Sequence, residues 1–420
     1  MLVDAWLPRA ARAHPQRPAV NDMSYAELLV AAREAAGALA ARGVRPGDRV
    51  AIALTPGTDF VVALHAVWGL GALAVPHDLR STAAERPPAD HIVEQLERTD
   101  PTDLVATLPL QASALLLRTS GTSGTPKLVE LTFGNLLWSA LGSGVALGVE
   151  WQDAWLCALP LAHVGGLSIV VRSAIYATHA LVHARFDAER VRATLDAGEA
   201  TLVSLVPTTL QRLLDGGLRD PPALRCALLG GAPVPTELAR RAAGAGIPLA
   251  QTYGLTEACS QVTTQTPGDP APDAGPPLFC TRVRIAPDGE ICVSGPTVAG
   301  GGELATGDLG RLDHEGRLTV TGRRADTIVT GAENVAPTEV EAVLAEHPAV
   351  AEAAVHGRPD PDWGEAVVAT VVLRPGSAAT AEGLRQHCRE RLAAFKVPKQ
   401  VAFTAALPRT SSGKLLRREL

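Results

Sequence analysis

A run of nine residues rich in glycine and hydroxyl groups is the strongest chemical signal in the sequence. It directly follows the apolar segment Ala114–Leu117, which is typical of a buried strand, and reads Thr119-Ser120-Gly121-Thr122-Ser123-Gly124-Thr125-Pro126-Lys127. Glycines let a backbone approach a phosphate, hydroxyl and N–H groups donate to its oxygens, and lysine adds positive charge. A flexible linker is the alternative, but nine residues in this order disfavour it. The run therefore predicts a phosphate-binding loop.

This loop differs from the Walker A motif. That motif has a lysine directly after its last glycine, and a helix follows at once. Here Thr125 and Pro126 separate the last glycine from the lysine. The next residues, Leu128–Leu131, have the pattern of another strand. The sequence therefore predicts a phosphate loop that lies between two strands.

Four further motifs follow in order, and they carry groups suited to a nucleotide and a metal ion. They read Tyr253-Gly254-Leu255-Thr256-Glu257, Thr306-Gly307-Asp308, Gly322-Arg323 and Arg409-Thr410-Ser411-Ser412-Gly413-Lys414. Glu257 is suited to Mg²⁺, because this ion prefers one or two protein oxygens together with phosphates and water. Asp308 is suited to accept hydrogen bonds from two ribose hydroxyls. Taken singly, Asp308 could be a turn residue, Glu257 a charge at a helix N-terminus, and Lys414 a solvated lysine near the end of the chain.

The five motifs in this order resemble the acyl- and aryl-adenylate-forming superfamily, which includes acyl-CoA synthetases, nonribosomal adenylation domains and luciferases. The resemblance spans essentially the whole chain. It implies an α/β fold, with a large N-terminal domain of mixed and parallel sheets with packed helices and a small, mobile α+β C-terminal domain. It also implies an acid–thiol ligase that uses ATP and Mg²⁺ to activate a carboxylic acid as its acyl-AMP. The acyl group then passes to coenzyme A.

The resemblance assigns roles to individual residues. Thr256 would hold the α-phosphate, Tyr253 would stack on adenine, and Asp308 would bind the ribose with Arg323 assisting. Glu257 would hold the metal ion. The implied nucleotide-binding set is Thr119, Ser120, Gly121, Thr122, Ser123, Gly124, Lys127, Gly231, Tyr253, Gly254, Asp308 and Arg323. The implied catalytic set is Lys414, Glu257, Thr256 and His163.

Lys414 is the lysine that, by resemblance, bridges the carboxylate and the α-phosphate during adenylation. The C-terminal domain of the family then rotates, removes this lysine and presents another face for thioester formation. Gly331–Asn334 would then help to shape the pantetheine tunnel. Two positions depart from the family pattern, because Ala325, before Asp326, replaces the usual Asp or Lys of the hinge, and Gly331-Ala332 replaces paired glycines.

The stretch that opens at Pro160 is the most informative about the acid. By resemblance, His163 lines the acyl pocket. Arg172 interrupts an otherwise apolar helix, and a buried arginine is costly unless an anion pairs with it. Arg172 therefore predicts a second carboxylate on the substrate, and the resemblance described next implies that this acid is an aromatic dicarboxylate. The alternative is an arginine that reaches the surface or binds helix carbonyls.

These features most resemble the 2-succinylbenzoate–CoA ligases of menaquinone biosynthesis. The resemblance adds Ser204, Gly230, Gly231 and Ala232 to His163 and Arg172 in the acid pocket. A general aryl or medium-chain acyl-CoA synthetase would share the nucleotide motifs without needing Arg172. A stand-alone adenylation domain would load a carrier protein instead. A non-catalytic nucleotide-binding descendant would have lost Lys414 or Glu257, and both are present.

Composition narrows the class of protein. The net charge is −6 with both signs mixed along the chain, and the basic run that ends in Arg417 and Arg418 is short, which argues against nucleic-acid binding. The six cysteines have no C-x-x-C spacing, so we expect neither a zinc site nor disulfides. Free cysteines suit a reducing compartment, so we expect a cytoplasmic protein. We find no signal sequence and no run of about eighteen apolar residues that would insert into a membrane. A homodimer is compatible with these features.

The order of predicted elements places the motifs on two domains. A chain of 420 residues is long enough for a large domain and a smaller one. Strands alternate with helices through the central section, which indicates parallel sheet, and Ser24 with Glu27 predicts a capped helix that runs to about Ala41. Ser81–Asp103 is predicted to be a surface connection. The pattern of predicted strands and helices changes near Arg323. We therefore expect two domains, over 1–324 and 325–420, with a helix over 381–394 in the second.

Overall fold

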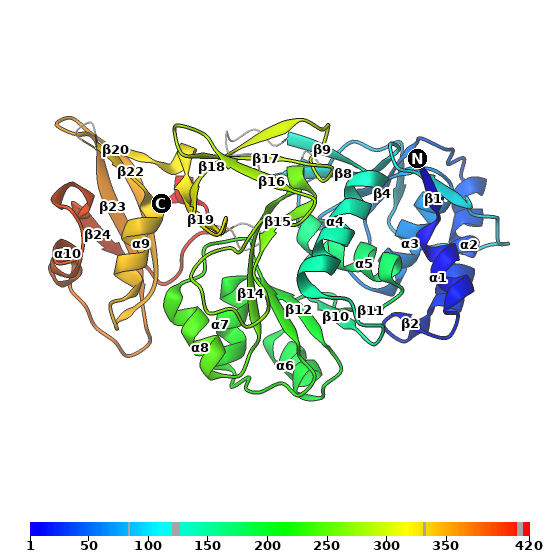
Figure 1. Ribbon diagram of the computed structural model, residues 1–420, viewed down its shortest axis with the longest axis horizontal. Helices are drawn as coiled ribbons and strands as arrows, with labels where there is room; N and C mark the ends of the chain where they lie inside the picture. The colour runs from blue at the N-terminus through cyan, green and yellow to red at the C-terminus, as the bar shows by residue number, and fades with distance from the viewer. Residues whose placement is uncertain (83–84, 120–126, 331–332, 410–414) are drawn as a thin grey trace.

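The computed structural model describes residues 1–82, 85–119, 127–330, 333–409 and 415–420. Two large sheets with packed helices make up most of the chain, and a smaller α+β unit lies at its C-terminal end (Figure 1). The predicted α/β class, with a large N-terminal part and a small C-terminal α+β unit, is confirmed. None of the helices in the described parts combines the length and the apolarity that a membrane crossing needs.

The largest sheet has eight strands in the order β15-β14-β13-β12-β10-β11-β2-β3. The strands from β14 to β2 run parallel, and β15 and β3 pair antiparallel at the edges. The strands are β2 (Pro18–Val20), β3 (Met23–Ser24), β10 (Ala154–Cys157), β11 (His179–Val182), β12 (Leu202–Leu205), β13 (Cys226–Leu229), β14 (Leu249–Leu255) and β15 (Ser260–Thr264). This parallel arrangement was predicted from the alternation of strands and helices.

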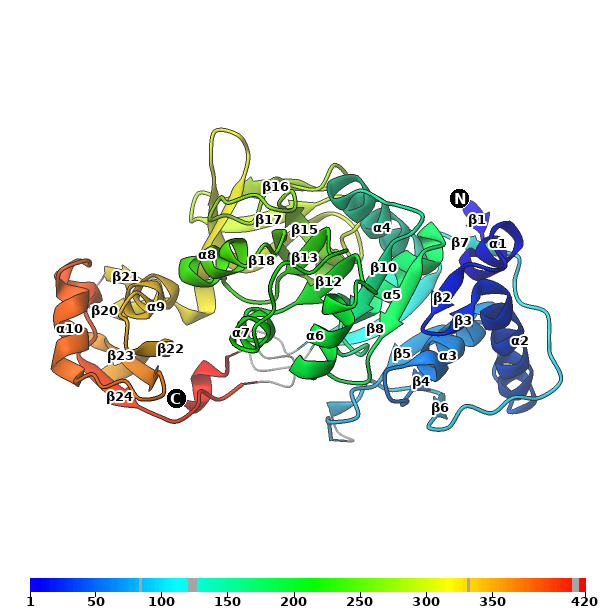
Figure 2. The ribbon, with the colours of Figure 1, turned by 90° about the horizontal axis from the view of Figure 1, so that it is seen from below.

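Helices connect these parallel strands, because parallel neighbours need a crossover. Those that follow β10, β11, β12 and β13 are α5 (Val164–Tyr176), α6 (Ala188–Asp196), α7 (Pro207–Asp215) and α8 (Thr236–Gly244). α5 packs on the inner face of the sheet beside α4 (Phe133–Leu147), and ten of its residues are buried. α6, α7 and α8 cover the other face around a second aliphatic cluster (Figure 2).

A second sheet has the order β6-β4-β5-β8-β9. Its strands are β4 (Arg49–Ile52), β5 (Leu73–Pro76), β6 (His91–Val93), β8 (Ser113–Thr119) and β9 (Lys127–Thr132). β8 and β9 are antiparallel. β8 ends at Thr119 and β9 begins opposite it at Lys127, so the two strands flank the predicted phosphate loop. β6 lies inside the segment Ser81–Asp103, which was predicted to be a surface connection. The prediction missed this strand, which pairs in parallel with β4.

The N-terminal helices cover this second sheet. They are α1 (Trp6–Ala13), α2 (Tyr25–Ala41) and α3 (Thr58–Gly69), and a short sheet joins β1 (Leu2–Asp4) to β7 (Thr107–Pro109). The predicted capping box at the start of α2 is present, since Ser24 N donates to Glu27 Oε2 at 2.8 Å and Glu27 N donates to Ser24 Oγ at 3.3 Å. Helix α2 therefore begins and ends where the sequence predicts.

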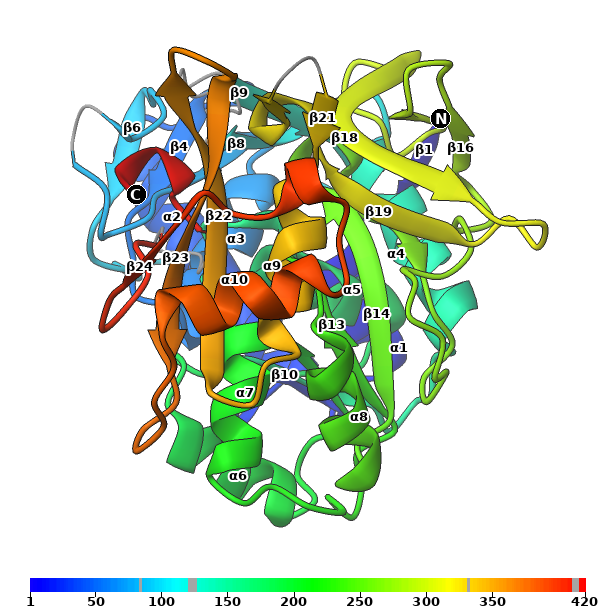
Figure 3. The ribbon, with the colours of Figure 1, turned by 90° about the vertical axis from the view of Figure 1, so that its left-hand side faces the viewer.

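The chain then forms an antiparallel sheet and the C-terminal unit. The antiparallel sheet contains β16 (Arg282–Ile285), β17 (Glu290–Ser294), β18 (Glu303–Leu312) and β19 (Leu318–Arg323). The C-terminal unit contains β20 (Ile328–Thr330), β21 (Glu333–Val335), α9 (Pro337–Ala345), β22 (Val350–Asp360), β23 (Gly364–Leu373), α10 (Ala381–Arg389) and β24 (Gln400–Phe403). It has its own aliphatic core, and Figure 3 shows α9 and α10 beside its sheet.

Two details of the C-terminal unit bear on its attachment and on the predictions. A single 3₁₀ turn, Arg324–Asp326, joins it to β19. The predicted helix over 381–394 is too long, because α10 ends at Arg389. Beyond it Arg391 N bonds to the Cys388 carbonyl three residues back, which is the tighter spacing of a helix end, and Leu392 N shares the same carbonyl.

Candidate active site

The predicted site residues follow the carboxyl ends of parallel strands. His163 follows β10, Gly230–Ala232 follow β13, and Thr256 and Glu257 follow β14. These strands belong to one sheet, and the carboxyl ends of parallel strands meet at the same edge. This is the edge at which open α/β sheets bind ligands, because loops from several strands converge there. The topology therefore brings together residues that are far apart in the sequence.

Tyr253, Asp308 and Arg323 form one hydrogen-bonded cluster. Tyr253 Oη donates to Asp308 Oδ2 at 2.9 Å, and Arg323 Nε donates to Asp308 Oδ1 at 2.7 Å. Burial and then the negative charge of Asp308 raise the pKa of Tyr253, so its phenol stays protonated and keeps donating. Asp308 is buried, and a carboxylate that has accepted two hydrogen bonds still has lone pairs for ribose hydroxyls. The Tyr253 ring is half-buried and packs against the aliphatic cluster around Ile291 and Val293.

The turn that carries Thr256 and Glu257 is strained and tightly packed. A Cβ on Gly254 would lie 1.8 Å from the carbonyl oxygen of Ser260, so only glycine fits there. Cys259 and Ser260 have φ of 54° and 94°, which is the left-handed region that non-glycine residues disfavour. Ser139 Oγ donates to the Cys259 carbonyl at 2.6 Å and helps to hold this conformation. Such strain gathers at functional sites, where the surrounding structure fixes it.

His163 stands at the N-terminal end of α5 and faces Asp78. Its Nε2 lies 3.6 Å from Asp78 Oδ2, which is longer than a hydrogen bond and makes an ion pair only when the imidazole is protonated. The contact with His163 is the strongest influence that holds the pKa of Asp78 well below its usual range; burial opposes it and Arg80 adds to it. Asp78 follows the carboxyl end of β5, in the second sheet. The two large sheets therefore meet at this pair.

Arg172 is fully buried between α4 and α5. It is 1% exposed, its Nη2 donates to Ser139 Oγ at 3.2 Å, and its Cζ lies 5.7 Å from the centre of the Trp155 ring. In the described part of the chain, Nε has no hydrogen-bond acceptor and no acidic side chain forms an ion pair with this guanidinium. Burial lowers the pKa of Arg172, while Tyr176 and Cys259 act in the opposite direction. The alternative of a surface arginine does not hold.

Trp155 contacts both Ser204 and Arg172. Trp155 Nε1 donates to Ser204 Oγ at 3.0 Å, and both residues are buried. The hydroxyl predicted to line the acid pocket is therefore engaged with a ring that lies against Arg172. Its direct partner in this structure is an indole.

The turn after β13 consists of small residues, Gly230–Ala232. A Cβ on Gly230 would meet Thr252 Cγ2 at 2.9 Å, and Gly231 has φ of 83°. Ala232 follows and is exposed. The small residues predicted in the acid pocket thus have steric reasons to be small, because Gly230 packs on β14 and Gly231 needs a left-handed backbone.

Several predicted residues lie outside the part of the chain that the structure describes. They are Ser120, Gly121, Thr122, Ser123, Gly124, Gly331 and Lys414. Their neighbours are placed: Thr119 and Lys127 end the two strands that bracket the phosphate loop. Arg409 and Leu415 bridge across the base of the Lys414 segment, and Leu416 N donates to the Pro408 carbonyl at 2.9 Å.

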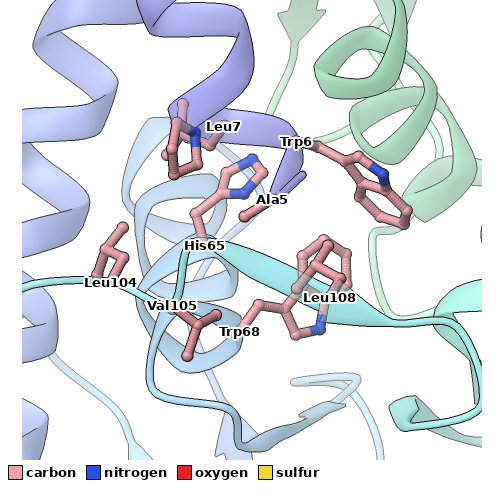
Figure 4. Close-up of a pocket in the computed structure, with 10 residues that line it drawn as sticks. Ala5, Trp6, Leu7, His65, Trp68, Leu104, Val105 and Leu108 are labelled. Carbon is pink, nitrogen blue, oxygen red and sulfur yellow. The ribbon is translucent and has the colours of Figure 1, made fainter. Parts of the chain in front are cut away.

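The small cavity in Figure 4 does not belong to this site. It has a volume of about 20 Å³ and lies among α1, α3 and the segment before β7, where Trp6, His65 and Trp68 line it. That volume holds about one water molecule. Burial lowers the pKa of His65 to about 4, so the ring is neutral near pH 7 and serves the packing of the core.

Two family models match the chain. The model described as AMP-binding enzyme matches residues 7–105 and 83–301, and the model described as AMP-binding enzyme C-terminal domain matches residues 339–414. The chain belongs to the AMP-binding enzyme family. The matches cover the two large sheets and most of the C-terminal unit with the Lys414 segment, whereas Asp308 and Arg323 lie between the two matched ranges.

This AMP-binding enzyme has relatives with a more specific name, and the similarity covers nearly the full length of both proteins. It is 38% identical over 473 residues to the 2-succinylbenzoate–CoA ligase of Bacillus subtilis, with 99% of this chain and 97% of that protein covered. Among solved structures, it resembles the o-succinylbenzoate CoA synthetase of Bacillus subtilis in complex with the acyl-adenylate intermediate OSB-AMP. That match has a TM-score of 0.92 and 37% identity, and it covers 100% of this chain and 98% of the other.

A second structure of the same Bacillus subtilis protein matches less closely. It is a double mutant bound to the product analogue OSB-NCoA, with a TM-score of 0.74 at 37% identity; the match covers 100% of this chain and 98% of that one. Since the two Bacillus subtilis chains differ little in sequence, the lower score reflects a different shape. The AMP-binding enzyme described here has the shape of the adenylate complex.

Two further residues of this AMP-binding enzyme were missed by sequence reasoning. Asp78 gave a usable signal, because it is an acidic residue two positions after a buried strand. Arg417 was counted only as part of a short basic run, yet it donates to Asp326 Oδ2 at 2.9 Å and to both carboxylate oxygens of Glu341 at 2.7 and 2.8 Å. It anchors the end of the chain to the turn after β19. No local sequence pattern predicts this contact, because Arg417 and Asp326 are far apart in the sequence.

Proposed function

We propose that this enzyme joins 2-succinylbenzoate to coenzyme A in an ATP-dependent reaction, a step of menaquinone biosynthesis. The observation that carries the proposal is the similarity over the full length of relatives with that name, with every predicted nucleotide motif present. The buried Arg172 supports an acid with a second carboxylate. A general aryl or medium-chain acyl-CoA synthetase would not need a cation there.

The reaction proceeds in two steps. The acid's carboxylate oxygen attacks the α-phosphorus of ATP, and pyrophosphate leaves to give the acyl-AMP. The thiol of coenzyme A, losing its proton, then attacks the acyl carbon, and AMP leaves as the thioester forms. Both partners of the first step are anions, so their approach requires cations and donors that are already in place.

We assign the nucleotide to the loops at the strand ends. Thr119, the residues that follow it and Lys127 hold the outer phosphates, and Thr256 donates to the α-phosphate. Asp308, fixed by Tyr253 and Arg323, accepts the ribose hydroxyls. Glu257 fits Mg²⁺, because one carboxylate together with phosphates and water satisfies this ion, which would neutralise phosphate charge. Gly231 and Gly254 let the backbone approach the nucleotide.

We assign the acid to the space between α5 and the turn after β13. His163, held by Asp78, lines the pocket near the reacting carboxylate, and Gly230–Ala232 border the aromatic ring. Arg172 receives the second carboxylate, which satisfies a buried guanidinium that has no acidic partner among the residues the structure describes. Ser204 acts through Trp155, whose ring it holds against Arg172.

The C-terminal unit supplies Lys414 in the first step and rotates for the second. We place the division of the chain at 324/325, within the turn Arg324–Asp326, and the TM-scores support the adenylation arrangement for this structure. After rotation, Gly331–Asn334 border the pantetheine of coenzyme A. We also propose a homodimer in the cytoplasm, a reducing compartment that six free cysteines support.

The test is pyrophosphate release with Mg-ATP and coenzyme A across four acids: 2-succinylbenzoate, benzoate, succinate and an acid of octanoate length. We expect clear preference for 2-succinylbenzoate, with its CoA thioester as the product. Preference for a monocarboxylate would retain the ligase mechanism but refute the dicarboxylate pocket. Pyrophosphate release without a CoA thioester would point instead to a carrier-protein acceptor.

A further inference from the structure

An apolar stripe runs along the outer face of α4. Trp138, Leu141 and Val145 are 36%, 40% and 68% exposed, and their spacing of three and four residues puts them on one face of the helix. Val149, just past the helix, is 45% exposed and lies against Gly144. Phe279 is 58% exposed, and its ring centre is 6.3 Å from that of Trp138. These five residues form the α4 stripe.

The helix beneath the stripe carries no charged side chain. α4 spans fifteen residues, Phe133–Leu147, without an Asp, Glu, Lys or Arg. Each of the other nine α-helices in the described parts has at least one, and that includes the buried α5. A surface helix normally places charges on its solvent face. A helix that lacks them, and also exposes a tryptophan and a neighbouring phenylalanine, is typical of an interface.

The size of the stripe suits a protein interface. The exposed fractions of its members add to about two and a half complete side chains. A large aromatic side chain buries roughly 150–250 Å², and Leu or Val buries less, so the stripe offers on the order of 400 Å² of apolar surface. A standard interface has about 800 Å² on each side, and in homodimers about 65% of it is apolar, which is roughly 500 Å². The stripe therefore supplies most of the apolar area that such an interface needs.

The charges at the two ends of the stripe select a second copy of this chain. Arg282, three residues beyond Phe279, is exposed at one end, where its neighbour Arg284 is already paired with Glu303. Glu150, directly after Val149, lies at the other end, and 67% of its side chain is accessible. Its Oε1 lies 4.0 Å from Nε of Arg225, whose closer partner is Asp153. In a two-fold contact, the helices α4 run antiparallel and each basic end meets an acidic end.

We propose that two copies of this chain associate through their α4 stripes about a two-fold axis. Phe279 and Val149 of one copy then face the opposite ends of the other. This interface gives the proposed homodimer its contact surface, and it does not depend on which acid the enzyme takes.

The inner face of α4 is separate from the stripe. Asn135 Nδ2 donates to the Pro296 carbonyl at 2.8 Å, and Ser139 Oγ donates to Cys259, next to the turn that carries Glu257. Tyr176 Oη also donates to the Ala140 carbonyl. Substitutions on the outer face therefore leave these contacts in place, so dimerisation and catalysis can be measured separately.

The experiment is analytical ultracentrifugation of the full chain across a wide range of concentrations. We expect the wild type to sediment with twice the chain mass and Val145→Glu with the mass of one chain. The matched control is Val30→Glu on α2, a valine that is 55% exposed and away from the stripe; it should remain a dimer. Circular dichroism and adenylation assays of both variants confirm that each is folded.

A charge exchange tests the two-fold geometry. Arg282→Glu should weaken the dimer, and adding Glu150→Arg to it should restore the dimer, because the two ends meet across the axis. A wild type with the mass of one chain, or a Val145→Glu variant that remains a dimer, would overturn the proposal. So would binding of a monomeric wild type to lipid vesicles or detergent that Val145→Glu abolishes, since the stripe would then serve a membrane surface.

Discussion

Replacing Arg172 with methionine should separate the stability of this enzyme from its activity. Methionine has a similar length and no charge, so it fills the same space between α4 and α5. The buried guanidinium makes one hydrogen bond, to Ser139, and has no acidic partner in the described part of the chain. Removing a buried charge without such a partner relieves its desolvation cost. We therefore expect the free energy of unfolding of Arg172→Met, without ligands, to be unchanged or higher.

The effect on activity should have the opposite sign. If Arg172 holds the second carboxylate of the acid, the variant leaves that carboxylate buried and unpaired. Loss of one partner of a buried charge pair costs about 2–5 kcal/mol. At 1.4 kcal/mol per factor of ten, kcat/KM for 2-succinylbenzoate should fall by roughly thirtyfold to several thousandfold. Pyrophosphate release from an acid of octanoate length should change little, because that acid has no second carboxylate.

The assay compares both acids with wild type, Arg172→Met and Arg172→Lys, alongside urea unfolding of the same three proteins. Arg172→Lys should recover part of the activity with 2-succinylbenzoate, since it restores the charge without the planar guanidinium. Equal losses of kcat/KM with both acids would remove Arg172 from acid recognition. A loss of stability that accounts for the lost activity would make it a structural residue.

Three further predictions concern other positions. Lys414→Ala should lower acyl-AMP formation about 10²- to 10³-fold yet retain thioester formation from supplied acyl-AMP, and retained adenylation would contradict its role. Asp78→Asn removes the anion facing His163, so kcat/KM for the acid should fall about tenfold with the KM for ATP unchanged; a change confined to ATP would place Asp78 elsewhere. Burial lowers the pKa of His65 from 6.5 to about 4, so the stability it contributes is complete above pH 6.5 and is lost as the pH falls toward 4. Urea unfolding should show a loss of roughly 2 kcal/mol at about pH 5 that His65→Leu abolishes, and the same loss in that variant would refute the assignment.

The sequence determined the local elements and the nucleotide chemistry, because both are encoded in short patterns. The Ser24 and Glu27 capping box fixes the start of α2 through two hydrogen bonds between residues three apart. Strands alternating with helices predicted the parallel sheet, and the adenylate-forming motifs predicted the family. Where α10 ends was predicted less well, since the apolar and polar pattern continues past the turn at Cys388 that stops it.

The tertiary structure decided which side chains meet, because these contacts join distant strand ends. Asp78 and His163 are placed together by two different sheets, and Ser204 turned out to bind Trp155 from the neighbouring strand β10. The sequence showed that Arg172 interrupts an apolar helix, but only the packing of α4 against α5 shows it fully buried. The physical reason is that a periodic pattern records which face of an element is apolar, whereas the partner of a polar side chain depends on how whole elements pack.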